Sequence, residues 1–330
     1  MIEGHGDDLY RYDKIKMNFS SNIYNGTDLS ELEAFLSSHM AVIRSYPEPS
    51  ATSLEQLIAR QCGIGPDEVL VTSGAVDAIY LIAQAFRKIG RCSIMQPTFR
   101  EYEDACRMFD YQIVEDGEMG WLCNPNNPTG SVATVETVLD TARNHQLLVV
   151  DQSYEDYTQA PLLTPADVVT SDNMITLHSM TKRYAVPGLR LGYVIAPAAI
   201  IRRLRGQYRP WAINALSLEA GKWLVQRGVS AIPDLSKYLA EAQRLRSLLN
   251  RIEGIKALDT QTNFFLCTIS QATASQLKEY LAQEHGILIR DASNFTGLTP
   301  HHFRIATQSP AENDALAAAL RNYLTTDYAH

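Results

Sequence analysis

Short apolar runs alternate with longer segments of helical spacing between residues 53 and 200. Seven runs are predicted strands: 69–72, 93–95, 111–114, 121–123, 147–151, 174–178 and 191–195. Several are apolar throughout, which is typical of strands covered on both faces. Segments 53–63 and 76–90 place apolar residues at i, i+3 and i+4 and end in glycine, so crossover helices are expected. The pattern predicts an α/β fold with a mostly parallel seven-stranded sheet.

The pattern changes after Pro210 and predicts a second, smaller α+β unit. Two long helical segments, 215–228 and 235–252, are followed by three strand-like segments and a last helix, at 263–269, 286–291, 302–307 and 312–324. Residues 1–45 show weak periodicity and many turn formers. We therefore predict an N-terminal segment (1–45) that packs with the small unit, a large domain (46–210) and a small C-terminal domain (211–330).

Composition narrows the classes of partner. The 330 residues are 45% hydrophobic and 20% charged, with a net charge of -8 and no run of lysines and arginines. Neither nucleic acid nor a membrane is an expected partner. The five cysteines show neither CxxC nor Cys/His ligand spacing, so no metal site or disulfide framework is predicted. The polar, acidic N-terminus is unlike a signal peptide, and a cytoplasmic location is expected.

Residues 179–193, SMTKRYAVPGLRLGY, follow a predicted strand and carry a lone lysine between hydroxyl residues and an arginine. A lysine becomes nucleophilic when neighbouring cations or desolvation lower its pKa, and as an imine it holds an aldehyde cofactor. Lys182 is therefore the candidate anchor. Arg190 would clamp a phosphate, to which Ser179 and Thr181 would donate hydrogen bonds. The alternative is a solvated loop with an ordinary surface lysine.

Two further segments end predicted strands at the edge where ligands collect in open α/β sheets. Residues 124–130, NPNNPTG, present side-chain amides on a backbone fixed by prolines, although a plain turn would look the same. Asp151 ends a buried-looking strand, and Tyr154 follows three residues later. A carboxylate there can keep a pyridine nitrogen protonated, whereas the alternative is an aspartate that caps a helix.

Residues 72–79, TSGAVDAI, lead from a predicted strand into a helix. The backbone N–H groups and Ser73 at such a helix N-terminus can hold a phosphate. Because strand-glycine-helix turns are frequent, an ordinary turn remains the alternative.

In this order, the segments resemble those of the pyridoxal-5'-phosphate (PLP) aminotransferase superfamily, with the aspartate aminotransferase fold, over nearly the whole chain. The resemblance implies that Lys182 carries PLP as a Schiff base, that Asp151 pairs with the pyridinium nitrogen, and that Asn127 and Tyr154 hydrogen-bond the phenolic oxygen. It assigns the cofactor phosphate to Ser73, Gly74, Ala75, Ser179 and Arg190.

The same resemblance gives roles to three residues that the segments above do not contain. Phe99, in PTFREY, would stack on the pyridine ring. Tyr46 would reach the cofactor phosphate of a neighbouring subunit, which implies a homodimer. Arg304, in HFRIAT, would grip the substrate carboxylate.

Within the superfamily, the chain is most similar to L-threonine-O-3-phosphate decarboxylases of cobamide (cobalamin) synthesis and next to histidinol-phosphate aminotransferases. The segments shared with the decarboxylases are the early His-Gly, NFSSNI, TKRYAVPGLRLGY, PWAINAL and LIRDASNF. The likeness implies a small phosphorylated amine or amino acid as substrate, with Arg290 on its phosphate and with His5 and Asn22 beside it. An ion pair at a strand end is the alternative for Arg290, and plain solvent exposure is the alternative for His5.

Three departures from the family pattern stand out. Thr72, Ser73 and Gly74 replace Gly-Asn-Gly, Asp7 replaces the second glycine after the early histidine, and a helical stretch before Trp121 is missing. The expected reaction is decarboxylation, with transamination as the alternative. A non-catalytic PLP-binding protein is a remote third possibility, because decay would be expected to erase Lys182 or Asp151.

Overall fold

The computed structural model describes residues 8–228 and 231–325. Its largest sheet has seven strands in the order β2-β8-β7-β6-β5-β3-β4, and only β8 runs antiparallel to its neighbours. The strands are β2 (Val69–Thr72), β3 (Arg91–Ile94), β4 (Gln112–Ile113), β5 (Met119–Cys123), β6 (Leu147–Asp151), β7 (Met174–Ser179) and β8 (Gly192–Ile195). The predicted α/β fold with a mostly parallel seven-stranded sheet is confirmed.

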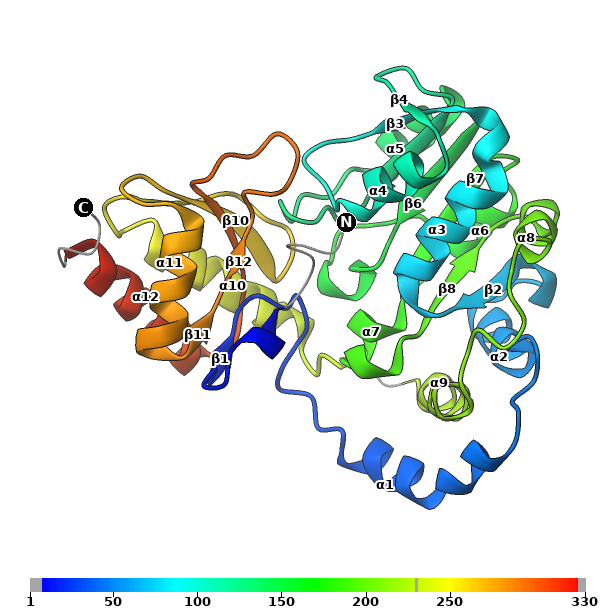
Figure 1. The fold of residues 1–330 in the computed structure, drawn as a ribbon, viewed down its shortest axis with the longest axis horizontal. Helices are drawn as coiled ribbons and strands as arrows, with labels where there is room; N and C mark the ends of the chain where they lie inside the picture. Colours follow the sequence, from blue (N-terminus) through cyan, green and yellow to red (C-terminus); the bar gives the residue numbers. More distant parts are fainter. Residues whose placement is uncertain (1–7, 229–230, 326–330) are drawn as a thin grey trace.

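Helices cover both faces of this sheet, as its fully buried strands require (Figure 1). One apolar core lies under α3 (Gly74–Phe86), α4 (Glu101–Met108) and α8 (Ala198–Arg205). The core of the other face lies under α2 (Thr52–Cys62), α5 (Val135–Arg143), α6 (Pro165–Val169) and α9 (Ala215–Arg227). Short turns of helix complete this part of the chain: η2 (Met40–Arg44), η3 (Pro66–Glu68), η4 (Arg87–Ile89), η5 (Glu155–Tyr157), α7 (Met180–Arg183) and η6 (Pro187–Leu189).

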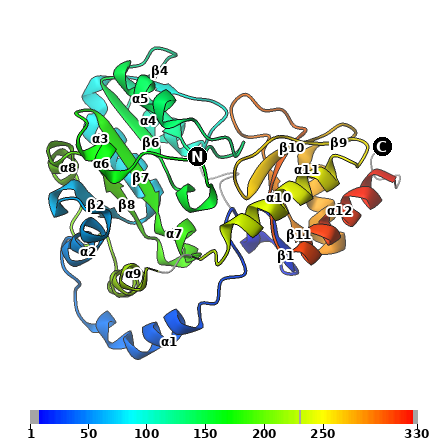
Figure 2. The ribbon, with the colours of Figure 1, turned by 180° about the vertical axis from the view of Figure 1, so that it is seen from behind.

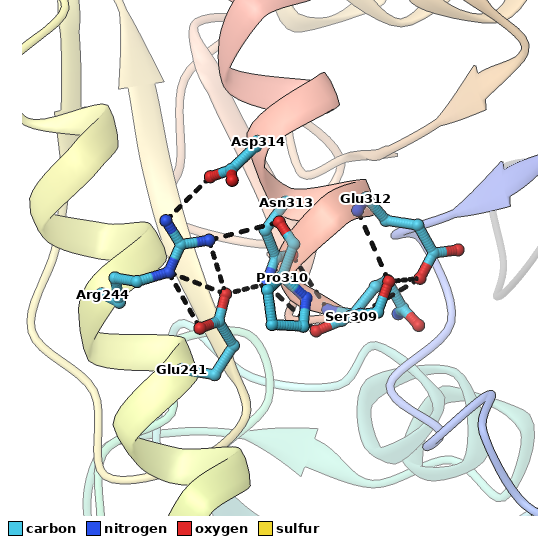
Figure 3. A network of polar contacts seen from close by, with 8 residues as sticks. Glu241, Arg244, Ser309, Pro310, Glu312, Asn313 and Asp314 are labelled. Atoms are coloured by element: carbon cyan, nitrogen blue, oxygen red, sulfur yellow. Dashed lines mark hydrogen bonds and ion pairs between the residues drawn. The ribbon is translucent and has the colours of Figure 1, made fainter.

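The small unit is built on a four-stranded antiparallel sheet, in the order β12-β13-β10-β9. Its strands are β9 (Ile255–Ala257), β10 (Phe264–Ile269), β12 (Arg290–Asp291) and β13 (His302–Ala306). It is covered by α10 (Leu235–Leu249), α11 (Ala274–Tyr280), a π-helical turn η7 (Leu281–His285) and α12 (Pro310–Thr325). Polar contacts centred on Arg244 join α10 to the start of α12 (Figure 3).

Helix α10 begins beside the large unit and runs along the small unit (Figure 2). It contributes to the core between the two units. Its buried Tyr238 packs with Tyr154 and Tyr157, which follow β6, and with Phe264 of β10. The hydroxyl of Tyr238 donates a hydrogen bond to the carbonyl oxygen of Thr307, at 2.6 Å. This aromatic cluster fixes the small unit beside the turn that follows Asp151.

The N-terminal segment contacts both units. β1 (Met17–Asn18) pairs in parallel with β11 (Ile287–Leu288), and the 3-10 turn η1 (Leu9–Arg11) lies close by, next to α11. In contrast, α1 (Ser30–Ser38) packs on α9, whose buried residues belong to the core of the large sheet. We therefore propose that the large domain includes α9, so that the boundary lies after residue 228 instead of at residue 210.

No helix among the described residues is long and apolar enough to cross a membrane.

Candidate active site

A cavity of about 310 Å³ opens at the carboxyl ends of β5, β6 and β7, between the large sheet and the small unit. This is the edge at which open α/β sheets bind ligands. Twelve of the residues singled out from the sequence line it: Asn22, Ala75, Phe99, Asn127, Asp151, Tyr154, Ser179, Thr181, Lys182, Arg190, Arg290 and Arg304.

Lys182 lies on α7, a single helical turn that begins directly after β7. Its Nζ is 5.6 Å from the centroid of the Tyr154 ring, so the amine and the phenol face the same space. The hydroxyl of Tyr157 donates a hydrogen bond to the Lys182 carbonyl oxygen at 2.9 Å. The short helix and this bond hold the lysine backbone against the turn that follows β6.

Asp151 ends β6 and is 4% exposed. Its two oxygens accept hydrogen bonds from different donors: Oδ2 from the hydroxyl of Tyr102 at 2.7 Å, and Oδ1 from the backbone N–H of Ser153 at 2.8 Å. Tyr102 lies on α4, is fully buried and lines the cavity. The sequence did not single it out, because its partner is 49 residues away and nothing local marks the contact.

Tyr154 is the second buried group beside Lys182. The side-chain amide of Asn22 donates to its hydroxyl at 3.3 Å, and its ring packs edge-on against Phe264 with 4.8 Å between centroids. Burial raises the pKa of Tyr154 to about 12, although the nearby Arg304 opposes the shift. The phenol therefore stays protonated at neutral pH and can donate a hydrogen bond into the cavity.

The N-terminus of α3 approaches the cavity beside Arg190. Gly74 has a φ of +84°, and a Cβ at this position would lie 2.6 Å from Nη2 of Arg190. A Cβ on Gly192 would lie 2.8 Å from the backbone nitrogen of Ala75, so the helix start packs closely on β8. The backbone N–H of Ser73 donates to Asp77 at 3.0 Å. Ala75 lines the cavity, whereas Ser73 and Gly74 are not among its lining residues.

Arg290 and Arg304 enter from the small unit. They are directly opposed on the antiparallel strands β12 and β13, and they are 8% and 6% exposed. Arg304 donates to the side-chain oxygen of Asn127 and, at 2.6 Å, to the backbone oxygen of Ser20. Arg290 donates to the side-chain oxygen of Asn294 at 3.0 Å. Burial lowers the pKa of Arg290, although it remains a cation at neutral pH.

Tyr46 is not among the residues that line the cavity. Tyr46 is 88% exposed, and its ring centroid is 5.7 Å from that of Trp211. His5 lies outside the described residues. Sequence reasoning also missed Cys123, which lines the cavity beside Asp151. Burial raises the pKa of its thiol to about 12, so it is neutral at physiological pH and shows none of the character of a reactive thiolate.

Among the described residues, no group of three or more His, Cys, Asp and Glu side chains is arranged to hold a metal ion.

A buried carboxylate, a lysine amine and two buried arginines thus line one cavity. Comparison with known families shows which family the chain belongs to. The model of the family described as aminotransferase class I and II matches residues 14–116 and 118–320. This chain belongs to the aminotransferase class I and II family. Its enzymes depend on PLP, which confirms the predicted cofactor and the predicted enzyme class.

Two similar relatives come from Caldanaerobacter subterraneus subsp. tengcongensis. One is a putative threonine-phosphate decarboxylase, 30% identical over 96% of this chain and 93% of its own length. The other is a histidinol-phosphate aminotransferase, also 30% identical, over 86% of this chain and 85% of its own length. The resemblance to these two groups is confirmed.

Solved structures agree with the sequence relatives. The L-threonine-O-3-phosphate decarboxylase from Porphyromonas gingivalis has a TM-score of 0.90 and 36% identity, over 94% of this chain and all of its own. A histidinol-phosphate aminotransferase from Sinorhizobium meliloti, in complex with pyridoxal-5'-phosphate, has a TM-score of 0.81 over 94% of this chain and 92% of its own. At 20% identity, the second structure supports the fold alone.

Proposed function

We propose that this PLP-dependent enzyme acts on a small amino acid that carries a phosphate, and that it removes the carboxylate of that substrate. The observation that carries the proposal is the buried pair of Arg290 and Arg304, side by side at the cavity. Planar guanidinium groups suit carboxylate and phosphate, to which they can donate two parallel hydrogen bonds. Two adjacent arginines therefore favour a substrate with two anionic groups.

The cavity side chains fit the cofactor chemically. Phe99 offers an aromatic face for the pyridine ring, and Asp151 offers a buried carboxylate for its nitrogen. Asn127 and Tyr154 would hydrogen-bond the phenolic oxygen, and Lys182 would supply the amine that binds the aldehyde, because all three line the same cavity. The phosphate would lie near the start of α3, where a helix N-terminus attracts anions. Its proposed ligands are Ser73, Gly74, Ala75, Ser179, Thr181 and Arg190.

When bound, PLP accepts the electron pair that is released as a bond to the substrate Cα breaks. The protein side chains direct this chemistry. Asp151 would keep a proton on the ring nitrogen, and Tyr154, protonated at neutral pH, would donate to the phenolic oxygen. Lys182, once replaced by the substrate amine, is free to carry a proton to or from Cα.

Arg304 and Arg290 would each bind one anionic group of the substrate. Arg304 already contacts Asn127, which belongs to the cofactor end of the cavity, so it is the ligand we assign to the carboxylate. Arg290, beside Asn294 and Phe295, is assigned to the phosphate farther from the ring. Asn22 would contribute from the N-terminal segment. His5 stays a prediction from the sequence.

Threonine phosphate is the substrate we favour, because the structure with 36% identity is that of a threonine-phosphate decarboxylase. Transamination of histidinol phosphate is the second candidate, supported by the histidinol-phosphate aminotransferase that is 30% identical to this chain. The deciding assay supplies threonine phosphate and measures carbon dioxide, then supplies histidinol phosphate with 2-oxoglutarate and measures glutamate. Glutamate without carbon dioxide would overturn the decarboxylase assignment.

We also propose a homodimer in which Tyr46 reaches the cofactor phosphate of the other subunit. The support is the exposure of Tyr46 and Trp211, whose rings lie together at the surface of one chain. Mixed dimers of Tyr46→Phe and Lys182→Ala chains test this arrangement, because one of their two sites would hold both intact residues. Activity that stays absent after mixing would contradict it. A role in cobamide synthesis and a cytoplasmic location stay predictions from the sequence.

A further inference from the structure

Tyr102 contacts the carboxylate of Asp151, which lines the cavity. Its hydroxyl lies 2.7 Å from Oδ2 of Asp151, and its side chain is fully buried. The backbone N–H of Ser153 binds the other oxygen, Oδ1, at 2.8 Å. With a separate donor on each oxygen, the carboxylate plane has one preferred orientation and cannot rotate without breaking a buried hydrogen bond.

The ring of Tyr102 is itself held in place. It stacks on Trp121 of β5, with 5.3 Å between centroids and 17° between planes. Its other neighbour is Phe99, which it meets edge-on at 5.8 Å. Burial and the adjacent Asp151 raise the pKa of Tyr102 well above its ordinary value, so the hydroxyl keeps its proton and acts as the donor.

We propose that Tyr102 is a positioning residue for the cofactor. By holding Oδ2 of Asp151, it sets the plane in which that carboxylate meets the N–H of the pyridine ring. This inference rests on the proposed function, because it assigns Asp151 to the ring nitrogen. It goes beyond that assignment in giving a role to a residue of another element, α4, which acts through Asp151.

The test compares two buried tyrosines that differ in one respect. Tyr102→Phe removes the hydroxyl on Asp151, whereas Tyr111→Phe removes a hydroxyl that donates to the backbone oxygen of Ala83 at 3.1 Å. Both side chains belong to the same apolar core. Each variant is titrated with PLP in the apo form, and visible circular dichroism of the bound cofactor is recorded.

We expect Tyr102→Phe to weaken PLP binding about tenfold, the size of one hydrogen bond to a charged group. Its visible circular dichroism should fall, and kcat should drop while KM for the amino substrate stays within about twofold. Tyr111→Phe should match the wild type in all three readouts. Equal PLP affinity in wild type and Tyr102→Phe, or equal losses in both variants, would overturn the proposal.

A cofactor analogue separates positioning from a general loss of structure. In 1-deaza-pyridoxal phosphate a C–H group replaces the ring nitrogen, so the ring has no N–H to donate a hydrogen bond to Asp151. The tenfold difference between wild type and Tyr102→Phe should therefore vanish with the analogue. If the same difference persists, the effect is structural and the proposal is wrong. If the wild type itself binds no PLP, the proposed function is wrong. That result differs from the two outcomes above, which concern only the difference between wild type and Tyr102→Phe.

Discussion

Arg290 and Arg304 lie directly opposite each other on antiparallel strands, and both side chains reach the cavity that contains Lys182. Residues paired in this way point to the same face of a sheet, and their Cβ atoms are typically about 5 Å apart. Two guanidinium groups are thus brought together where burial makes their repulsion and desolvation costly. A substrate with two anionic groups would relieve both.

Loss of one of these cations should weaken recognition of the substrate phosphate. A hydrogen bond to a charged group contributes about 1.5–3 kcal/mol, so Arg290→Met should lower kcat/KM for threonine phosphate by about 10- to 100-fold. The preference for threonine phosphate over threonine should shrink by a similar factor. Steady-state kinetics with both substrates measures the change.

Arg244→Met is the matched control for that experiment. Arg244 also belongs to the small unit and has two acidic partners, Glu241 and Asp314, but its contacts join α10 to α12 (Figure 3). It does not line the cavity. Its replacement should leave both kcat/KM values unchanged, and an equal loss in the two variants would assign the effect to the stability of the small unit.

The start of α3 offers a test of the phosphate site. Gly74→Ala would place a methyl group 2.6 Å from Arg190 Nη2, on a backbone with a φ of +84°. The left-handed backbone costs an alanine about 1–2 kcal/mol of stability. Because the methyl group would also displace the guanidinium that we assign to the phosphate, PLP affinity should fall about tenfold, the size of one hydrogen bond to a charged group. Gly188→Ala is the control in the same region, because a Cβ there meets no atom within 4 Å. Equal PLP affinity in the two variants would contradict this phosphate site.

The buried carboxyl group of Asp156 should make the free energy of unfolding depend on pH. Burial raises the pKa of Asp156 to about 6, against the opposing charge of Arg183. An unfolded aspartate titrates near 4, so the folded protein binds an extra proton between about pH 4 and 6. The stability from this group is complete below about pH 4 and is lost as the pH rises through 6.

Asp156→Asn should remove that loss. The fall in unfolding free energy from pH 4 to pH 7 should be smaller than in the wild type, by at most about 3 kcal/mol. Denaturant unfolding at a series of pH values measures it. Asp116→Asn, at a carboxylate whose side chain is 85% exposed, is the control. Parallel stability curves for wild type and Asp156→Asn would show that this carboxylate is not the source.

The buried strands of the large sheet, such as β5, β6 and β7, were predictable because each is a short, mostly apolar run. A strand that is buried on both faces has apolar residues at nearly every position, so its sequence alone identifies it, as in the run that ends at Asp151. The segment 286–291 was harder. It reads as one strand but divides into β11 and β12, which belong to different sheets. A local pattern shows that a segment is extended without showing its partners.

The same limit applies to the site. Lys182, Asp151 and Arg190 are marked by their neighbours in the chain, and the structure brings them to one cavity. Tyr102 carries no such mark, since its bond to Asp151 depends on how α4 packs over the sheet. Helix α9 likewise has an ordinary amphipathic pattern, and only its packing on α2 assigns it to the large unit.

The most direct test of the account is reduction of the PLP-loaded enzyme with borohydride, followed by proteolysis and mass spectrometry. We predict that the cofactor becomes fixed to the peptide that contains Lys182, and that Lys182→Ala remains unlabelled under the same treatment. A wild-type protein that stays unlabelled, or a label on another lysine, would contradict the central claim.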